Sequence, residues 1–174
     1  MIVVSKVLHP CNTFKRIFLA VPNDAQHEPG FYEWIQTIKS FAKQIAASIE
    51  IFANEELAQI INYELKKTKQ AIKVNIDHFD DWDDFLVLAG RMKANDLIIF
   101  IKARKKSISF HSAMDVIPQK LMKYHDDLSV LFIYPHQDNV QLNEKNAQSP
   151  TKKKSPLIKR VISNVLHHKN SEEK

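Results

Sequence analysis

The chain has 174 residues, of which 44% are hydrophobic, and this is enough for one ordinary domain with a buried core. No apolar run approaches the roughly 18 to 20 residues that a transmembrane helix needs, and residues 1–8 lack the length and the cleavage site of a secretory signal. Cys11 is the only cysteine, which excludes an internal disulfide and a thiolate zinc cluster and fits a reducing compartment. We therefore expect a soluble cytoplasmic domain or fragment.

The net charge of +5 is concentrated at the C-terminal end. Residues 150–174 hold seven basic and two acidic residues, whereas the 18 basic and 18 acidic residues of 1–149 cancel. A neutral domain with a basic tail argues against a nucleic-acid groove on the domain itself. The sequence thus predicts two parts, a neutral domain and a basic tail.

Five short apolar runs rich in β-branched residues predict buried strands. They are residues 16–21, 49–53, 72–76, 97–101 and 128–134. The runs are nearly continuous rather than alternating, as a parallel sheet covered on both faces requires.

Helical periodicity lies between these runs. The predicted helices span about residues 31–45, 57–65, 82–92 and 115–124, with Pro118 in the first turn of the last one. The alternation predicts an α/β domain with a doubly wound parallel five-stranded sheet in the order 3-2-1-4-5. A ligand would bind at the carboxyl ends of the strands, beside loops 22–28 and 102–114.

The boundaries follow from composition. Residues 1–13 are a lead-in, 14–137 form the α/β domain, 138–155 form a polar linker, and 156–174 form a basic amphipathic helix and tail. Six aliphatic residues between 157 and 166 lie opposite Lys159, Arg160 and Asn164 on that helix. The segment suits anionic lipid or a protein groove, and the alternative is that it has no fixed structure.

Glycine is scarce, and this excludes several nucleotide sites. Gly30 and Gly90 are the only two glycines, and both lie in or beside predicted helices. A Walker loop, a dinucleotide fingerprint and a glycine-rich phosphate loop all need glycine for close approach of the backbone to phosphate. None of these loops can be built from this chain.

The segment after the fourth predicted strand, residues 102–112, holds four cations, three hydroxyls and a histidine. A guanidinium group can form a bidentate contact with phosphate or carboxylate, and hydroxyl and imidazole groups can donate beside it. The candidate residues of an anion or nucleotide site are Arg104, Ser107, Ser109, His111 and Asn23. The alternative is a solvated basic loop that only keeps an exposed segment soluble.

Other clusters favour structural roles. The acidic cluster comprises Asp77, His78, Asp80, Asp81, Asp83 and Asp84. It could hold a hard cation, but acids at the start of the third helix are better explained as a cap and as partners of the helix dipole. His78 could border the crevice and titrate near neutral pH. We expect no metal site and no enzyme, because the histidines are scattered and no serine sits in a nucleophile elbow.

Six short segments carry a family resemblance. The most specific elements are Ala103-Arg104, then Ser109-Phe110-His111, then Pro118-Gln119-Lys120-Leu121, and residues 18–23, 28–32 and 131–135 add to them. Together they resemble the cytoplasmic C-terminal region of bacterial sodium(cation)/proton antiporters of the monovalent cation:proton antiporter-2 group. That region is of the universal-stress-protein, adenine-nucleotide-alpha-hydrolase-like type, and the resemblance covers about residues 14–137.

The resemblance implies a non-catalytic regulatory domain at the cytoplasmic face of the inner membrane. Its partner would be the transmembrane antiporter domain of the same polypeptide or complex, it would form a homodimer, and its ligand would be an adenine nucleotide or a cyclic dinucleotide. Pro22 replaces an aspartate near the adenine, Asp115-Val116 replaces Gly-Ser or Gly-Thr, and Lys102 replaces a small residue, which disfavours ATP binding of the usual type. The alternative is a free-standing universal-stress-type nucleotide-binding protein that dimerises through its fifth strand.

Overall fold

The computed structural model describes residues 1–67, 72–78, 82, 85, 87 and 90–136, all within the compact unit Met1–His136. The predicted linker 138–155 and the helix and tail 156–174 lie outside the described residues. Among the helices that are described, none has the length and apolar character needed to cross a membrane.

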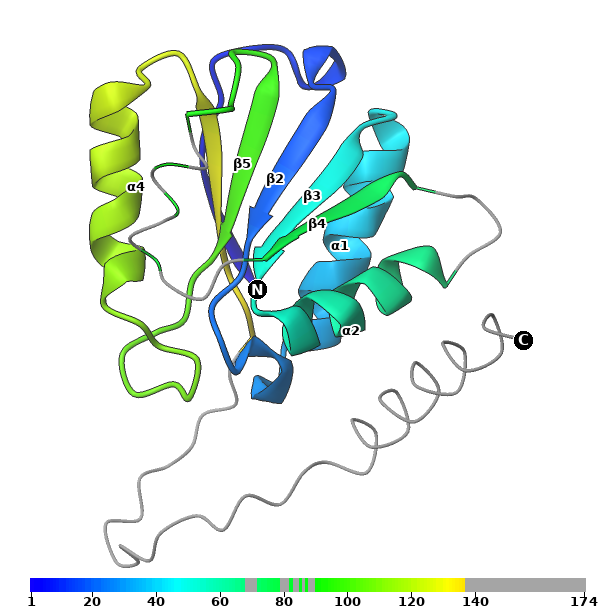
Figure 1. Cartoon of the computed structure of the whole chain (residues 1–174), viewed down its shortest axis with the longest axis vertical. Coiled ribbons are helices and arrows are strands. Elements are labelled where there is room, and N and C mark those ends of the chain that lie inside the picture. The colour runs from blue at the N-terminus through cyan, green and yellow to red at the C-terminus, as the bar shows by residue number, and fades with distance from the viewer. Residues whose placement is uncertain (68–71, 79–81, 83–84, 86, 88–89, 137–174) are drawn as a thin grey trace, which may run out of the picture. The chain divides into compact units, whose positions relative to one another are not determined.

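The sheet has six strands in the order β1-β6-β5-β2-β3-β4 (Figure 1). Their bounds are β1 (Ile2–Lys6), β2 (Arg16–Ala20), β3 (Ser48–Ala53), β4 (Val74–His78), β5 (Asp96–Ile101) and β6 (Ser129–Tyr134). The strands β4, β3, β2, β5 and β6 are parallel and follow one another in the predicted relative order. The α/β class is therefore confirmed.

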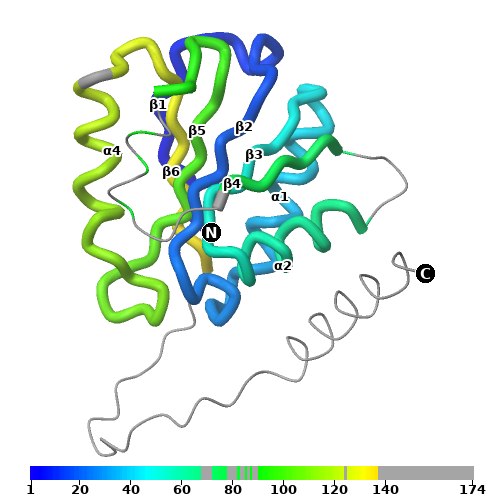
Figure 2. Tube along the Cα trace, in the orientation of Figure 1, coloured from blue at the N-terminus to red at the C-terminus, as the bar shows by residue number. Residues whose placement is uncertain are grey.

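The prediction of a five-stranded sheet is wrong, because residues 2–6 add an antiparallel sixth strand to the edge of β6 (Figure 2). All five residues of β1 are exposed. A strand that lies outside the core leaves only a weak signal in the sequence, and the predicted lead-in 1–13 therefore contains a strand that the apolar pattern does not mark.

Three helices are described, α1 (Phe31–Gln44), α2 (Glu55–Lys66) and α4 (Ala113–Tyr124), together with the short turns η1 (Cys11–Thr13) and η2 (Ala25–His27). Asn54 caps α2, since its Oδ1 atom accepts a hydrogen bond from the amide of Leu57 at 2.9 Å. Helix α4 begins two residues before its predicted start, so Pro118 lies beyond the first turn. Five of the eleven residues of the predicted helix 82–92 lie outside the described residues.

A row of phenylalanine rings crosses one face of the sheet. Phe18 of β2 stacks on Phe52 of β3 at 5.5 Å, and Phe100 of β5 stacks on Phe132 of β6 at 5.7 Å between ring centroids. Phe85 lies 5.8 Å from Phe52 and 5.4 Å from Phe100, so it joins the two stacked pairs. The apolar side of α4 packs on the same cluster.

Helices α1 and α2 cover the other face, and the strands lie between them and α4 (Figure 1). Buried aliphatic residues alternate with the phenylalanines along the strands, as two covered faces require. Lys39 of α1 is 4% exposed, and its Nζ donates to the carbonyl of Glu64 at 2.8 Å. This carbonyl lies in the last turn of α2, where no amide of the helix is available to it. Burial lowers the pKa of Lys39.

An ion-pair network joins the amino ends of the strands. Asp96 is 1% exposed; its Oδ1 accepts from Arg16 Nε at 3.0 Å and its Oδ2 accepts from Arg16 Nη2 at 2.7 Å. The same Oδ2 accepts from the amide of Lys93 at 2.8 Å. Glu50 lies farther away, 3.7 Å from Arg16 and 3.6 Å from Arg91. The hydrogen bond to Asp96 raises the pKa of Arg16.

Replacing Asp96 by Asn should lower the free energy of unfolding by about 3 kcal/mol. The change removes the negative partner of a buried, bidentate ion pair. It also places the NH₂ group of Asn against the N–H groups that now donate to the carboxylate. Urea denaturation monitored by circular dichroism measures the change.

Glu50→Gln is the matched control, because it neutralises an acid of the same network whose contacts are longer than hydrogen bonds. Its loss should stay below about 1 kcal/mol. Equal losses in the two variants would show that the network acts through net charge and not through the Arg16–Asp96 contact.

Candidate functional site

Two loops meet at the carboxyl ends of β2 and β5, as expected for a doubly wound sheet. Glu28 lies in the loop after β2, and its Oε1 atom accepts hydrogen bonds from Ser109 Oγ at 2.7 Å and from Ser109 N at 3.2 Å. Ser109 is 4% exposed. The contact therefore closes the space between the two loops with a buried hydroxyl and a carboxylate.

The segment 102–112, called the basic loop below, is built from consecutive tight turns. The amide of Lys102 donates to the carbonyl of Ile133 at 2.8 Å, which ties the start of the loop to β6. The amide of Ser107 then donates to Arg104 at 3.0 Å, and the amide of Phe110 donates to Ser107 at 3.2 Å. The loop is thus held at both ends and folded back on itself between them.

The four cations of the basic loop divide into one that is paired and three that are not. Lys102 Nζ lies 2.8 Å from Asp115 Oδ1 and 5.7 Å from the ring centroid of Phe132, and its side chain is 12% exposed. Arg104, Lys105 and Lys106 are exposed, and none of them forms an ion pair with another residue that the structure describes. These three cations make an open basic surface.

The five predicted site residues are not gathered into one pocket. Ser109 is bound to Glu28, and Asn23 Oδ1 accepts from Asn54 Nδ2 at 2.9 Å, next to the start of α2. Those two side chains are used in contacts within the protein.

The other three predicted residues lie along the basic loop itself. Arg104 is exposed and Ser107 is half-buried. His111 is exposed, and its Nδ1 accepts from the amide of Ala113 at 3.3 Å. The imidazole ring lies 6.3 Å from the indole ring of Trp82. The residues that share the exposure and positive charge of Arg104 are therefore Lys105 and Lys106, and not the predicted serines.

Gly30, which precedes α1, serves close packing. A Cβ atom at this position would lie 2.6 Å from the amide nitrogen of His136 and 3.0 Å from its carbonyl oxygen. The chain just after β6 therefore passes directly over the start of α1, and the glycine gives room to a peptide group of the protein itself.

Metal-binding clusters and the predicted acidic cluster give no further site. In the described part of the chain, no group of three or more histidine, cysteine, aspartate or glutamate side chains could hold a metal ion. Asp77 is paired with Arg91. The side chains of His78 and of the four aspartates 80, 81, 83 and 84 lie outside what the structure describes.

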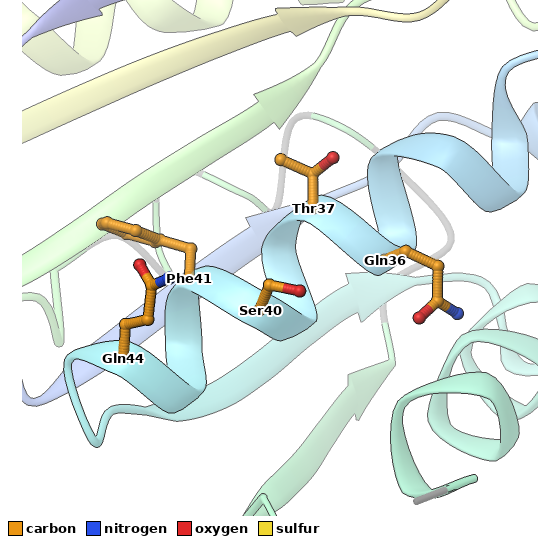
Figure 3. Close-up of a pocket in the computed structure, with 5 residues that line it drawn as sticks. All are labelled: Gln36, Thr37, Ser40, Phe41 and Gln44. Carbon is orange, nitrogen blue, oxygen red and sulfur yellow. The ribbon is translucent and has the colours of Figure 1, made fainter.

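A surface depression of about 510 Å³ lies on α1 (Figure 3). Its described lining residues are Gln36, Thr37, Ser40, Phe41 and Gln44. All five come from one side of a single helix, and one helix cannot surround a ligand, so this depression does not carry a binding-site argument.

Comparison with known proteins finds no match: no protein-family model, no curated protein and no solved structure is similar to this chain.

Sequence analysis missed Glu28, the residue that joins the two loops. The available signal was weak, since a single glutamate in a loop has many uses. Its place in the loop after β2, opposite a loop with three serines, is the feature that could have indicated a hydroxyl–carboxylate contact.

Replacing Glu28 by Ala should lower the free energy of unfolding by about 2 kcal/mol, because it leaves the buried Ser109 hydroxyl and amide without their acceptor. The amide of Ser109 should also exchange its hydrogen faster. Urea denaturation and amide hydrogen exchange measure the two effects.

Asp24→Asn is the control for charge, because Asp24 lies in the same loop, is 56% exposed and only approaches His27 at 3.9 Å, and Asn tolerates the left-handed backbone conformation at this position. It should leave both measurements unchanged. If Glu28→Ala changes neither of them, the two loops are held together by other contacts.

Proposed function

We propose that this chain is a non-catalytic regulatory domain of a cation/proton (Na⁺/H⁺) antiporter, of the universal-stress-protein type. In this proposal it works at the cytoplasmic face of the inner membrane, with the transmembrane antiporter domain of the same polypeptide or complex as its partner. The family-like segments of the sequence support the proposal, as does the relative order of the five parallel strands.

One observation carries the proposal. The basic surface, the start of β1 and the end of β6 all lie at the side of the sheet where the parallel strands have their carboxyl ends. Ile2 of β1 pairs with Tyr134 of β6, and Ile101, which precedes the basic loop, pairs with Ile133. A neighbour attached before β1 or after β6 would therefore begin at the edge that presents Arg104, Lys105 and Lys106. In this arrangement a ligand on the basic surface would lie next to such a neighbour and could change its contacts directly.

The ligand in this proposal is a phosphate-bearing anion, such as an adenine nucleotide or a cyclic dinucleotide. Arg104 provides a bidentate donor, and Lys105 and Lys106 add positive charge that no described acid neutralises. The surface is open, so affinity would come from charge and would fall with salt.

Chemistry on a bound ligand is disfavoured. Ser109 Oγ is hydrogen-bonded to a carboxylate, as an activated nucleophile could be, but the residue is 4% exposed and faces the loop after β2. A buried hydroxyl cannot reach a substrate on the basic surface. Binding without turnover is therefore the activity that the site supports best.

If the basic surface binds such an anion, titration with ATP, a cyclic dinucleotide or inorganic phosphate should raise the melting temperature. At one hundred times the dissociation constant the gain is about 2.7 kcal/mol in the free energy of unfolding. Arg104→Ala should lose most of this gain, as measured by differential scanning fluorimetry.

Lys120→Ala is the control, because it removes one exposed positive charge from α4, outside the basic loop. It should keep the full shift. An absence of any shift with all three probes in the native protein would refute anion binding, and a shift retained in Arg104→Ala would move the site elsewhere.

The link to an antiporter is tested separately. Cells that express the native gene should be separated into membrane and soluble fractions, and peptides of this chain should be identified by mass spectrometry after electrophoresis. We expect them in the membrane fraction, in a polypeptide longer than this chain or in a complex with a transporter. Recovery only as a free soluble 20.2 kDa protein would contradict the antiporter proposal and favour a free-standing binding protein.

A further inference from the structure

The N-terminal strand exposes a continuous apolar surface. Every residue of β1 is exposed, and its apolar members are Ile2, Val3 and Val4, which are 54%, 48% and 51% exposed. Met1, Val7 and Leu8, at 37%, 41% and 45%, extend the surface at both ends. No other stretch of the described chain has six large apolar side chains exposed within eight residues.

The position of β1 makes this surface more than a set of scattered residues. β1 is the last strand of the sheet, paired on one side with β6, and no described strand lies on its other side (Figure 2). Its side chains alternate between the faces: Val4 lies opposite Phe132 and Val3 opposite Ile133. An apolar edge strand with free backbone groups is a template for one more strand.

We propose that β1 pairs with the β1 strand of a second copy of this chain. The two strands would run antiparallel about a twofold axis and join the two sheets into one. This inference is independent of the proposed function, since it uses neither the basic loop nor an anion.

Self-pairing is favoured by the charges of the strand. Lys6 is the only charged side chain of β1, and it lies at the end of the strand. When two such strands run antiparallel and centre on Val4, Lys6 of each lies beside Ile2 of the other, and the two lysines are at opposite ends. Like charges are thereby kept apart, whereas a partner that binds through ion pairs would find a single cation.

The area favours a reversible dimer. Pairing two edge strands covers their backbone edges and only the flanks of these six side chains on both copies, so the buried area lies below the roughly 1,200 Å² of small specific complexes. The dimer should therefore form in a concentration-dependent way.

Strand β1 also blocks one contact expected from sequence, the dimer through the fifth predicted strand. A dimer through the fifth predicted strand needs the free edge of β6, and β1 occupies that edge along Val130 to Tyr134. The edge available for pairing at this end of the sheet is the outer edge of β1.

Sedimentation velocity of the full chain over a wide concentration range tests the proposal. The native protein should shift from 20.2 kDa toward twice that mass. Val4→Lys and Val4→Glu should each weaken self-association at least tenfold, because like charges would then face each other across the twofold axis. An equal mixture of the two variants should associate again, since Lys and Glu would then lie together.

Val116→Lys is the matched control, because Val116 is 48% exposed and lies on α4, not on an edge strand. It should associate like the native protein. Val3→Lys provides a second disrupting variant on the opposite face of the strand, and thermal melting of each variant checks that the fold is kept. The proposal is overturned if the native chain stays monomeric at all concentrations. It is also overturned if the Val3→Lys and Val4→Lys variants both still dimerise. Restored association in the mixture of the Lys and Glu variants is the result that strand-to-strand contact predicts.

Discussion

The row of phenylalanine rings on one face of the sheet is the contact around which the domain is organised. Phe52, Phe18, Phe100 and Phe132 belong to four adjacent strands, so their stacking depends on the register of all four. Phe85 and helix α4 pack on the row, and Lys102 lies over its last ring. The first cation of the basic loop is thus held against the core, and the three that follow it are left facing solvent.

The parallel strands could be predicted because burial on both faces leaves a run of apolar residues in the sequence. Strand β1 could not, because an edge strand with exposed residues has no buried face to mark it. The buried amine of Lys39 was also unpredictable, since its place depends on a carbonyl at the end of another helix. The start of α4 was set by turns after His111, which local propensity does not record.

For the candidate site, the sequence predicted which two loops meet, but not which of their side chains face solvent. Strand order alone brings the loops after β2 and β5 together, and they meet through Glu28 and Ser109. Which hydroxyls face solvent depends on side-chain contacts between the loops, and no periodicity carries that information. The pairing of Arg16 with Asp96 could have been predicted from the sequence, because opposite charges stand at the first positions of two neighbouring parallel strands.

Three non-glycine residues of the described chain have a left-handed backbone conformation. They are Asp24, Ala46 and Lys106, with φ of 64°, 53° and 80°. Each costs about 1 kcal/mol or more relative to glycine in the same turn. A chain with two glycines in 174 residues has fewer backbone conformations to lose when it folds, which offsets part of that cost. Lys106 keeps its conformation because both ends of its loop are anchored. The fold therefore sets the backbone spacing of the three exposed cations, and under the proposed function an anion would bind without the entropy cost of ordering the backbone of the basic loop.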